Sequence, residues 1–269
     1  MYYKIGEVSK MTNLSDQMIR YYEKCGVISP TRSGDGNYRN YTIMDIYALF
    51  DAMRYKEWGI NIGDINQMVN ENYYVTLNEN IQKLYKSLKS EIHMKSLLME
   101  RIEKYGKKLT LCRYNLMNFW VDMIPAHYLY LSNEAVGDTH KKSNISETMN
   151  NFIYSHKNIS FFDVRVEFEE NYQKWWYAIE TRYHDALKTP DEGIFRVVPE
   201  QICLCTMIDM GEIGTFDAST SIEPIIHYLK KSGYHQVGPV SGMLIGRGNE
   251  QKHYRRIMEI YIPITIKSL

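Results

Sequence analysis

The chain of 269 residues is long enough for two domains or one large domain, and its 44% hydrophobic and 24% charged residues are typical of a globular protein. Its 32 basic and 32 acidic side chains balance, so charge alone does not indicate a nucleic-acid partner. The absence of a roughly 20-residue apolar run, of a signal peptide and of a cysteine framework predicts a cytoplasmic protein without membrane contact.

Two short helices joined by a tight turn are predicted at the N-terminus. Ile5, Val8 and Met11 share one face of the first helix. Ser15 is a preferred N-cap for the second helix, which ends at Gly26. This arrangement is typical of a helix-turn-helix motif, although the pattern alone is common.

A ribbon and two further helices are predicted next. The Gly-rich and aromatic stretch SGDGNYRNYTIMDI indicates a turn-rich ribbon, or wing, followed by a helix capped near Thr42. That helix stops at Gly59, and Asn61 caps another one.

This region resembles the DNA-binding domain of the MerR family of transcriptional regulators in four segments: YKIGEVSKMTNLS, IRYYEKCGVISP, NYRNYTIMDI and MRYKEWGINIGDI. The segments cover about residues 2 to 70, and four blocks in order are far more specific than any one of them. The resemblance implies a winged helix-turn-helix DNA-binding domain over residues 1–75.

The resemblance also implies a set of DNA-contacting side chains. Gln17 and Arg20 lie one turn apart on the exposed face of the second helix, within reach of bases or phosphates. Packing in the core or the wing is the alternative role for Tyr22, Tyr38 and Tyr41. The candidate DNA-binding residues are Ser15, Gln17, Arg20, Tyr21, Tyr22, Arg39, Tyr41, Arg54 and Lys56.

One long helix is predicted in the middle of the chain. From Leu77 to about Leu111, apolar residues recur at steps of three and four without an intervening proline. Such a stripe needs a partner, which favours a coiled coil. The resemblance implies a homodimer joined by an antiparallel coiled coil over residues 76–120. The alternative is packing of this helix onto the chain's own C-terminal domain.

The cysteines do not indicate a metal site. Several MerR relatives sense metals through cysteines near the end of this helix, where Cys112 lies, but no cluster of Cys or His accompanies it. Cys203 and Cys205 alternate within an apolar strand, as core residues do. We expect no metal and no other cofactor.

Residues 121–269 contain an internal repeat of strand, helix, strand and strand. The first copy is AHYLYLS, ISETMNNFIYS, FFDVRVEF and KWWYAIETRY, and the second is QICLCTMID, STSIEPIIHYLKKSG, SGMLIGR and YRRIMEIYIPIT. PDEGIFRVVPE connects them, and Glu259 to Pro263 form a closing Glu-x-x-x-Pro strand. These segments resemble the GyrI-like effector-binding domain, which implies a duplicated βαββ fold and an α+β class for the whole chain.

Strand alternation places Glu259 opposite the core face of its strand. Met258 and Ile260 share the core face, whereas Glu259 and Tyr261 share the other. Superposing the repeats makes Glu180 the counterpart of Glu259. Two carboxylates beside an aromatic crevice suit a lipophilic ligand that is cationic or aromatic.

Other partners for these carboxylates stay open. Glu259 has Arg255 and Arg256 nearby in sequence, or a wet edge of the sheet, and Glu180 has Arg182. The candidate ligand-binding residues are Glu259, Glu180, Trp176, Tyr261, Tyr128, Tyr130, Phe168, Tyr183 and Tyr234.

Together these features predict a ligand-responsive transcriptional regulator and not an enzyme. The resemblance implies a homodimer on an inverted repeat in double-stranded promoter DNA, which activates by distorting the DNA for RNA polymerase. One alternative is a GyrI-like hydrolase or drug-sequestering protein with a DNA-binding module, in which Glu259 and Tyr261 act as base or nucleophile. A ligand-independent repressor is the other.

Overall fold

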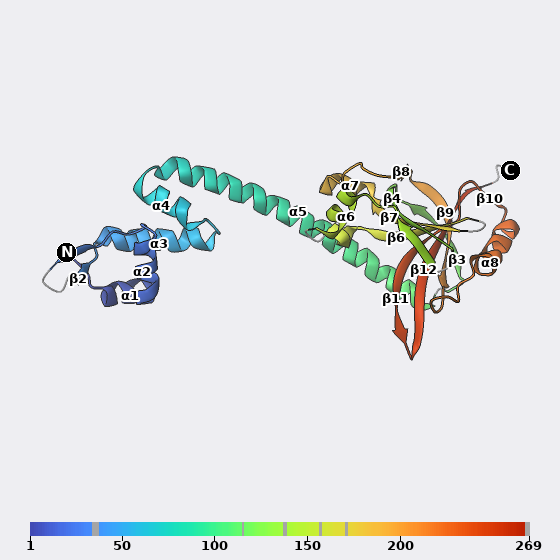
Figure 1. Ribbon diagram of the computed structural model, residues 1–269, viewed down its shortest axis with the longest axis horizontal. Helices are drawn as coiled ribbons and strands as arrows, with labels where there is room; N and C mark the ends of the chain where they lie inside the picture. Colours follow the sequence, from blue (N-terminus) through green and yellow to red (C-terminus); the bar gives the residue numbers. More distant parts are fainter. Residues whose placement is uncertain (34–37, 115, 137–138, 156–157, 170–171, 267–269) are drawn as a thin grey trace. The chain divides into compact units, whose positions relative to one another are not determined.

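The computed structural model describes residues 1–33, 38–114, 116–136, 139–155, 158–169 and 172–266. The chain divides into two compact units, Met1–His93 (unit one) and Met94–Leu269 (unit two) (Figure 1). Helix α5 (Tyr73–Tyr114) contributes residues to both units. The helices together with a large sheet confirm the mixed helical and sheet class, and the domain limits at residues 75 and 120 stay predictions.

Unit one begins with helices that start at the predicted capping residues. Ser15 accepts a hydrogen bond from the Met18 amide, Thr42 caps the next long helix in a capping box, and Asn61 caps the last. The elements before α5 are α1 (Ile5–Thr12), α2 (Asp16–Lys24), β1 (Thr31–Ser33), β2 (Tyr38–Asn40), α3 (Ile43–Glu57) and α4 (Ile62–Asn70).

One apolar core holds unit one together. Val8 and Ile19 are fully buried between α1 and α2, together with Leu49 of α3 and Ile65 of α4. Met11 differs from the prediction, because it is half exposed and not on the inner face of α1. The wing strands β1 and β2 pair antiparallel as predicted, and residues 34–37 at their tip lie outside the described residues.

Unit two is built on one large antiparallel sheet whose strands run in the order β3-β9-β12-β11-β6-β7-β4-β5. Short strands β10 and β8 pair with β12 and β4 at its margins. Its elements after α5 are β3 (Phe119–Ile124), β4 (His127–Val136), β5 (Thr139–Ser143), α6 (Glu147–Tyr154), a 3₁₀ turn (Asn158–Phe161), β6 (Asp163–Phe168), β7 (Gln173–Glu180), α7 (Thr181–Leu187), β8 (Phe195–Val198), β9 (Gln201–Asp209), α8 (Ala218–Lys231), β10 (Tyr234–Gln236), β11 (Ser241–Glu250) and β12 (His253–Ile266).

The predicted repeat corresponds to two runs of these elements, β4-α6-β6-β7 and β9-α8-β11-β12, joined where β11 pairs with β6. One part of the prediction is wrong. Thr181 begins helix α7 and does not continue the strand, although its amide still donates to the carbonyl of Ala126 beside the last β4–β7 pair. Strand β8 lies inside the segment predicted as a connector.

The two faces of β12 differ as alternation predicts. Met258 and Ile260 pack with Ile225 and Leu229 of α8 in one core, while Tyr261 lies in a second cluster. That second cluster contains Cys203, Cys205 and Ile124.

Helix α5 combines a packed face with an exposed apolar stripe. Met94, Leu97 and Leu98 pack against the core beneath α6, so this part of the helix does pack onto the C-terminal domain. Other members of the predicted stripe are exposed and recur at multiples of seven residues: Ile81, Leu88, Ile102 and Leu109. Among the described helices, none has the length and apolarity needed to cross a membrane.

Candidate functional site

Helix α2 presents four of the predicted DNA-binding residues at the surface of unit one. Gln17 and Arg20 are exposed, one turn apart, and Tyr21 is 41% exposed. Ser15 accepts from the Met18 amide at 3.2 Å and so begins the helix. Polar and cationic side chains on an exposed helix of this motif can reach bases and phosphates.

An ion pair joins the wing to α2. Glu23 accepts from Nε of Arg39 at 2.7 Å, and Arg32 lies 3.6 Å from the same carboxylate. The predicted phosphate contacts on α3 are both exposed: Arg54 lies 3.7 Å from Asp51, and Lys56 is on the surface.

Two predicted DNA contacts belong to the core. The ring and hydroxyl of Tyr41 are fully buried, which excludes contact between this side chain and DNA in this conformation. Tyr22 is 3% exposed and packs in the same core. Burial raises the pKa of both phenols, so both stay neutral. Core packing, the alternative for these rings, is what the structure shows.

A cavity of about 300 Å³ lies within unit two between the C-terminal part of α5 and the sheet. We call it the α5 cavity. Apolar walls come from Ile124, Pro125 and Met243, and Tyr105, Tyr183 and Tyr261 add aromatic surface. Met123 adds to the apolar wall, and the remaining lining is polar or charged: Arg101, Lys104, Lys107, Lys108, Asp122, His127, Asp163 and Glu180.

Glu259 lies behind the wall of the α5 cavity and is bound on two sides. Its carboxylate accepts from Nζ of Lys108 on α5 and, at 2.6 Å, from the hydroxyl of Tyr261. Lys108 Nζ also donates to the Tyr261 hydroxyl at 3.1 Å. Burial, and then the neighbouring Glu259, raises the pKa of Tyr261, so its hydroxyl stays protonated and donates.

The two sequence-based alternatives for Glu259 are wrong. Arg255 pairs with Asp209 and Glu250, each at 2.6 Å, and Arg256 donates to the carbonyl oxygen of Glu212 at 2.7 Å. Glu259 is 4% exposed, which also excludes a wet edge. The countercharge comes from a lysine far away in the sequence, on a different element.

Glu180 lines the cavity at the end of β7 and pairs with Arg182, as the alternative had it. Arg182 donates from Nε to Glu180 at 2.7 Å and from Nη1 to Glu100 of α5 at 2.6 Å. Tyr183 follows and also lines the cavity. Thus Glu180 and Tyr261 line one cavity, Glu259 lies behind Tyr261, and the two carboxylates have different cationic partners.

Two buried groups near the cavity have no counterpart in the sequence-based site. Arg165 of β6 is 4% exposed, donates to the Ser241 hydroxyl at 2.9 Å, and stands 5.1 Å from the ring centroid of Tyr261. His127 donates from Nδ1 to the Pro125 carbonyl at 2.5 Å if that nitrogen is protonated. Burial, and then Arg165, lowers the pKa of His127 to about 4.

The other predicted aromatic residues do not line the α5 cavity, which corrects that part of the site. Tyr128 stacks on His184 at 3.6 Å, and Tyr130 lies in the core beneath α6. Phe168 and Tyr234 pack in the core of α8. The prediction fails for these four rings because the sequence does not distinguish the aromatic wall of a cavity from an aromatic core.

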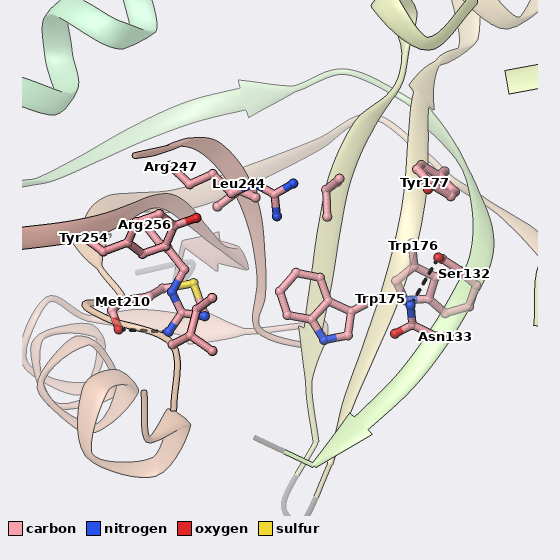
Figure 2. A pocket seen from close by; sticks show the side chains of 12 residues that line it. Ser132, Asn133, Trp175, Trp176, Tyr177, Met210, Leu244, Arg247, Tyr254 and Arg256 are labelled. Carbon is pink, nitrogen blue, oxygen red and sulfur yellow. Dashed lines mark hydrogen bonds between the residues drawn. The ribbon is translucent and has the colours of Figure 1, made fainter. Parts of the chain in front are cut away.

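Trp176 borders a different cavity of about 340 Å³, at the point where β11 leaves β6 (Figure 2). The two strands pair only over residues 241–243, and beyond that Trp175 points into the opening. Arg247 and Tyr254 approach from the hairpin on the other side. No sequence motif identified this second cavity.

The thiols are placed as core or helix residues. Burial raises the pKa of Cys203 to about 11 and also raises the pKa of Cys112 and of Cys205. Among the residues with described positions, no three His, Cys, Asp or Glu side chains are grouped for a metal ion.

Comparison with known proteins concerns mainly unit one. The family model "MerR family regulatory protein" matches residues 4–41. Over 65 residues the chain is 37% identical to the heavy metal-dependent transcription regulator 2 of Rhizobium meliloti, covering 24% of this chain and 44% of that protein. Over 110 residues it is 27% identical to the uncharacterized HTH-type transcriptional regulator YyaN of Bacillus subtilis, and the match covers 40% of this chain and 80% of that protein.

Among solved structures, the EcmrR–DNA complex in EcmrR-RPo aligns with 98% of this chain and 100% of its own, at 16% identity and a TM-score of 0.38. The chain spans less than half the length of the first curated relatives that it matches. The matched residues 4–41 contain α1, α2, β1 and β2. The N-terminal region of this chain, over residues 4–41, therefore matches the MerR family of regulatory proteins.

Proposed function

We propose that the chain is a ligand-responsive transcriptional regulator, which binds double-stranded promoter DNA through unit one and a small-molecule effector in the α5 cavity. One observation carries the effector site: the buried carboxylate of Glu259 is bonded to Lys108 and Tyr261, which both line a cavity with apolar and aromatic walls. Such a combination suits a lipophilic cation, whose charge meets the carboxylate while its body covers the apolar wall.

A homodimer on an inverted repeat fits the surface of α5. The exposed apolar residues at seven-residue multiples, among them Ile81, Leu88 and Ile102, are what one strand of a coiled coil presents to another. An antiparallel pairing, as the family resemblance implies, then gives two copies of α2 for two half-sites.

Activation is proposed to act through the shape of the promoter. The effector favours the dimer conformation to which it binds more tightly, and that conformation distorts the DNA for RNA polymerase. The repeated βαββ order of unit two supports a GyrI-like effector-binding domain.

The hydrolase alternative has less support from the geometry. The Tyr261 hydroxyl donates a hydrogen bond to Glu259, and its raised pKa disfavours a phenolate nucleophile at neutral pH. Glu259 is also engaged by Lys108. Mass spectrometry of candidate ligands after incubation with the protein tests this alternative directly, since a hydrolase releases products.

The proposed function is tested with the full chain. DNA selected from a random pool is placed in a promoter, and transcription by RNA polymerase is measured with and without the small aromatic cation benzyltrimethylammonium. We expect DNA binding to an inverted repeat and a rise in transcription with the cation. Glu259→Gln should keep DNA binding and lose the response, whereas Glu250→Gln, an exposed control on the same hairpin, should keep both. An unchanged response in Glu259→Gln overturns the proposal.

A further inference from the structure

Lys108 stands where a cationic ligand of Glu259 would place its charge. The ammonium bonds to the carboxylate, lies 3.1 Å from the Tyr261 hydroxyl, and is 5.6 Å from the centroid of the Tyr261 ring. An anion together with an aromatic ring is the environment that receptors offer to an organic ammonium ion.

The two members of this ion pair differ in their freedom to move. The side chain of Glu259 is 5% exposed and is held by Tyr261 within the sheet, whereas that of Lys108 is 31% exposed. A lysine has a flexible stem of four methylene groups, so its ammonium can swing into water while its backbone stays helical. Removing Lys108 without a replacement leaves a buried carboxylate unpaired, which is unfavourable. A second cation removes that obstacle.

The cavity has room for such a replacement. Lys108 and Tyr261 both line the α5 cavity of about 300 Å³, next to the apolar side chains of Met243 and Ile124. This volume is at the lower end of the range for small-molecule sites. A compact cation with one aromatic ring therefore fits better than a large polycyclic one.

Two other carboxylates of the cavity, Asp163 and Glu180, are held by arginines with several bonds each, and the third, Asp122, is exposed to solvent. Arg101 binds Asp163 at 2.7 Å and the carbonyl of Ser160 at 2.5 Å. Arg182 bridges Glu180 and Glu100. A guanidinium fixed by two acceptors is harder to displace than a single ammonium. Glu259 is therefore the buried carboxylate whose cationic partner can be exchanged for a ligand.

We propose that Lys108 is an internal competitor of the effector: a cationic ligand binds by taking its place beside Glu259 and Tyr261, and the released lysine frees one attachment of α5 to the sheet. This competition rests on the proposed function. It adds how the site recognises its ligand and how ligand binding affects helix α5. A ligand with the same shape and no charge cannot displace the lysine.

Calorimetric titration of the full chain with benzyltrimethylammonium tests the competition. Lys108→Met should bind the cation at least about tenfold more tightly than wild type, because the competitor is gone and Glu259 needs a counter-ion. Lys89→Met, an exposed lysine of the same helix outside the cavity, should match wild type within about twofold. The double variant Lys108→Met with Glu259→Gln should lose the gain. Neopentylbenzene is the neutral isostere of this cation. Its affinity should not rise in Lys108→Met or fall again in the double variant.

A second measurement uses the wild-type protein and does not depend on the folding of a variant. Acetylation of lysine amines followed by mass spectrometry should show slow labelling of Lys108 in the free protein and faster labelling with saturating benzyltrimethylammonium. Lys89 serves as the internal control and should not change. A purely structural role for Lys108 does not give this ligand-dependent exposure.

The outcomes separate the two proposals. Equal affinities of wild type and Lys108→Met, or unchanged Lys108 labelling with bound cation, overturn the competition and leave the α5 cavity as an effector site. Absence of cation binding in every variant overturns the effector site and the competition together. If the wild-type protein binds no promoter DNA, the proposed role in transcription is overturned, and the two proposals on the α5 cavity are not affected.

Discussion

Arg101 of α5 donates from Nη2 to Oδ1 of Asp163 on β6 at 2.7 Å, and the two side chains are only 14% and 16% exposed. A buried pair of this kind holds the helix to the sheet. Removing one partner leaves the other charge without compensation. We expect Asp163→Asn to lower the free energy of unfolding of the full chain by about 3 kcal/mol.

Urea unfolding measures this loss. Glu103→Gln is the matched control, because Glu103 forms an ion pair on the same helix with Lys107 and both side chains are mostly exposed. That surface pair should contribute less than about 0.5 kcal/mol. Equal losses in the two variants contradict the role of the buried pair.

Stability should fall on acidification through the titration of His127. Its pKa is lowered from 6.5 to about 4 in the folded protein by burial and by Arg165. Between these two values the unfolded chain binds more protons, so stability decreases as pH falls from above 6.5 toward 4. From about pH 7.5 to about pH 5, this residue alone should remove roughly 2 kcal/mol.

Comparison of urea unfolding at these two pH values in wild type and His127→Gln isolates the contribution, since other titrating groups are common to both. His235→Gln, at an exposed histidine, is the control and should follow wild type. A His127→Gln variant with the same acid sensitivity as wild type shows that other groups are responsible.

DNA binding should depend on the exposed face of α2. Arg20→Ala is expected to weaken binding to the selected DNA about tenfold and to reduce the slope of log K against log salt by about one, if Arg20 contacts a phosphate. Gln17→Ala should lower discrimination between base pairs by about 1–3 kcal/mol at one position, if the glutamine contacts a base. Fluorescence anisotropy at several salt concentrations measures both effects.

Lys230→Ala removes an equivalent exposed charge from α8 in unit two and should leave DNA affinity unchanged. A similar loss in Lys230→Ala indicates a general effect of charge. No loss in Arg20→Ala contradicts the placement of α2 against DNA.

Dimerisation should depend on the exposed stripe of α5. Leu88→Lys puts a charge where an apolar side chain is expected to enter the partner helix, and it should raise the dissociation constant of the dimer at least about a hundredfold. Analytical ultracentrifugation gives this constant. Ile213→Lys makes the same chemical change at an exposed isoleucine of unit two and should leave the dimer intact. Monomeric wild-type protein contradicts the coiled coil outright.

The buried thiols should be inert. Because the pKa of Cys203 is about 11 and that of Cys205 is also raised, few thiolates form near pH 8 and burial limits access. Iodoacetamide should label these two cysteines at least about a hundredfold more slowly in the native protein than in urea. Rapid native labelling of Cys203 shows that the sheet opens.

Local signals in the sequence predict much of the fold and less of the site. The capping residues Ser15, Thr42 and Asn61 mark helix starts correctly because a cap depends on neighbours three residues away. Alternation likewise separates Glu259 from Met258 because it depends on strand geometry alone.

Partners distant in sequence leave no such local signal. Lys104, Lys107 and Lys108 are similar in sequence, and only the tertiary structure shows which of them reaches Glu259. In DVRVEF, alternation separates Arg165 from Val166 but does not indicate which face is covered, and the structure buries both. An arginine with a hydrophobic neighbour on either side is usually read as solvent-facing.

Glu259 is the carboxylate that opposes two cations around Tyr261. Lys108 and the guanidinium of Arg165 both approach this ring, and Glu259 opposes them. With a neutral side chain in place of Glu259, the same walls would favour carboxylates or sulfonates over amines. One codon change at this position could therefore reverse the chemical class of effector without rebuilding the cavity, a short evolutionary route between chains that answer to opposite kinds of compound.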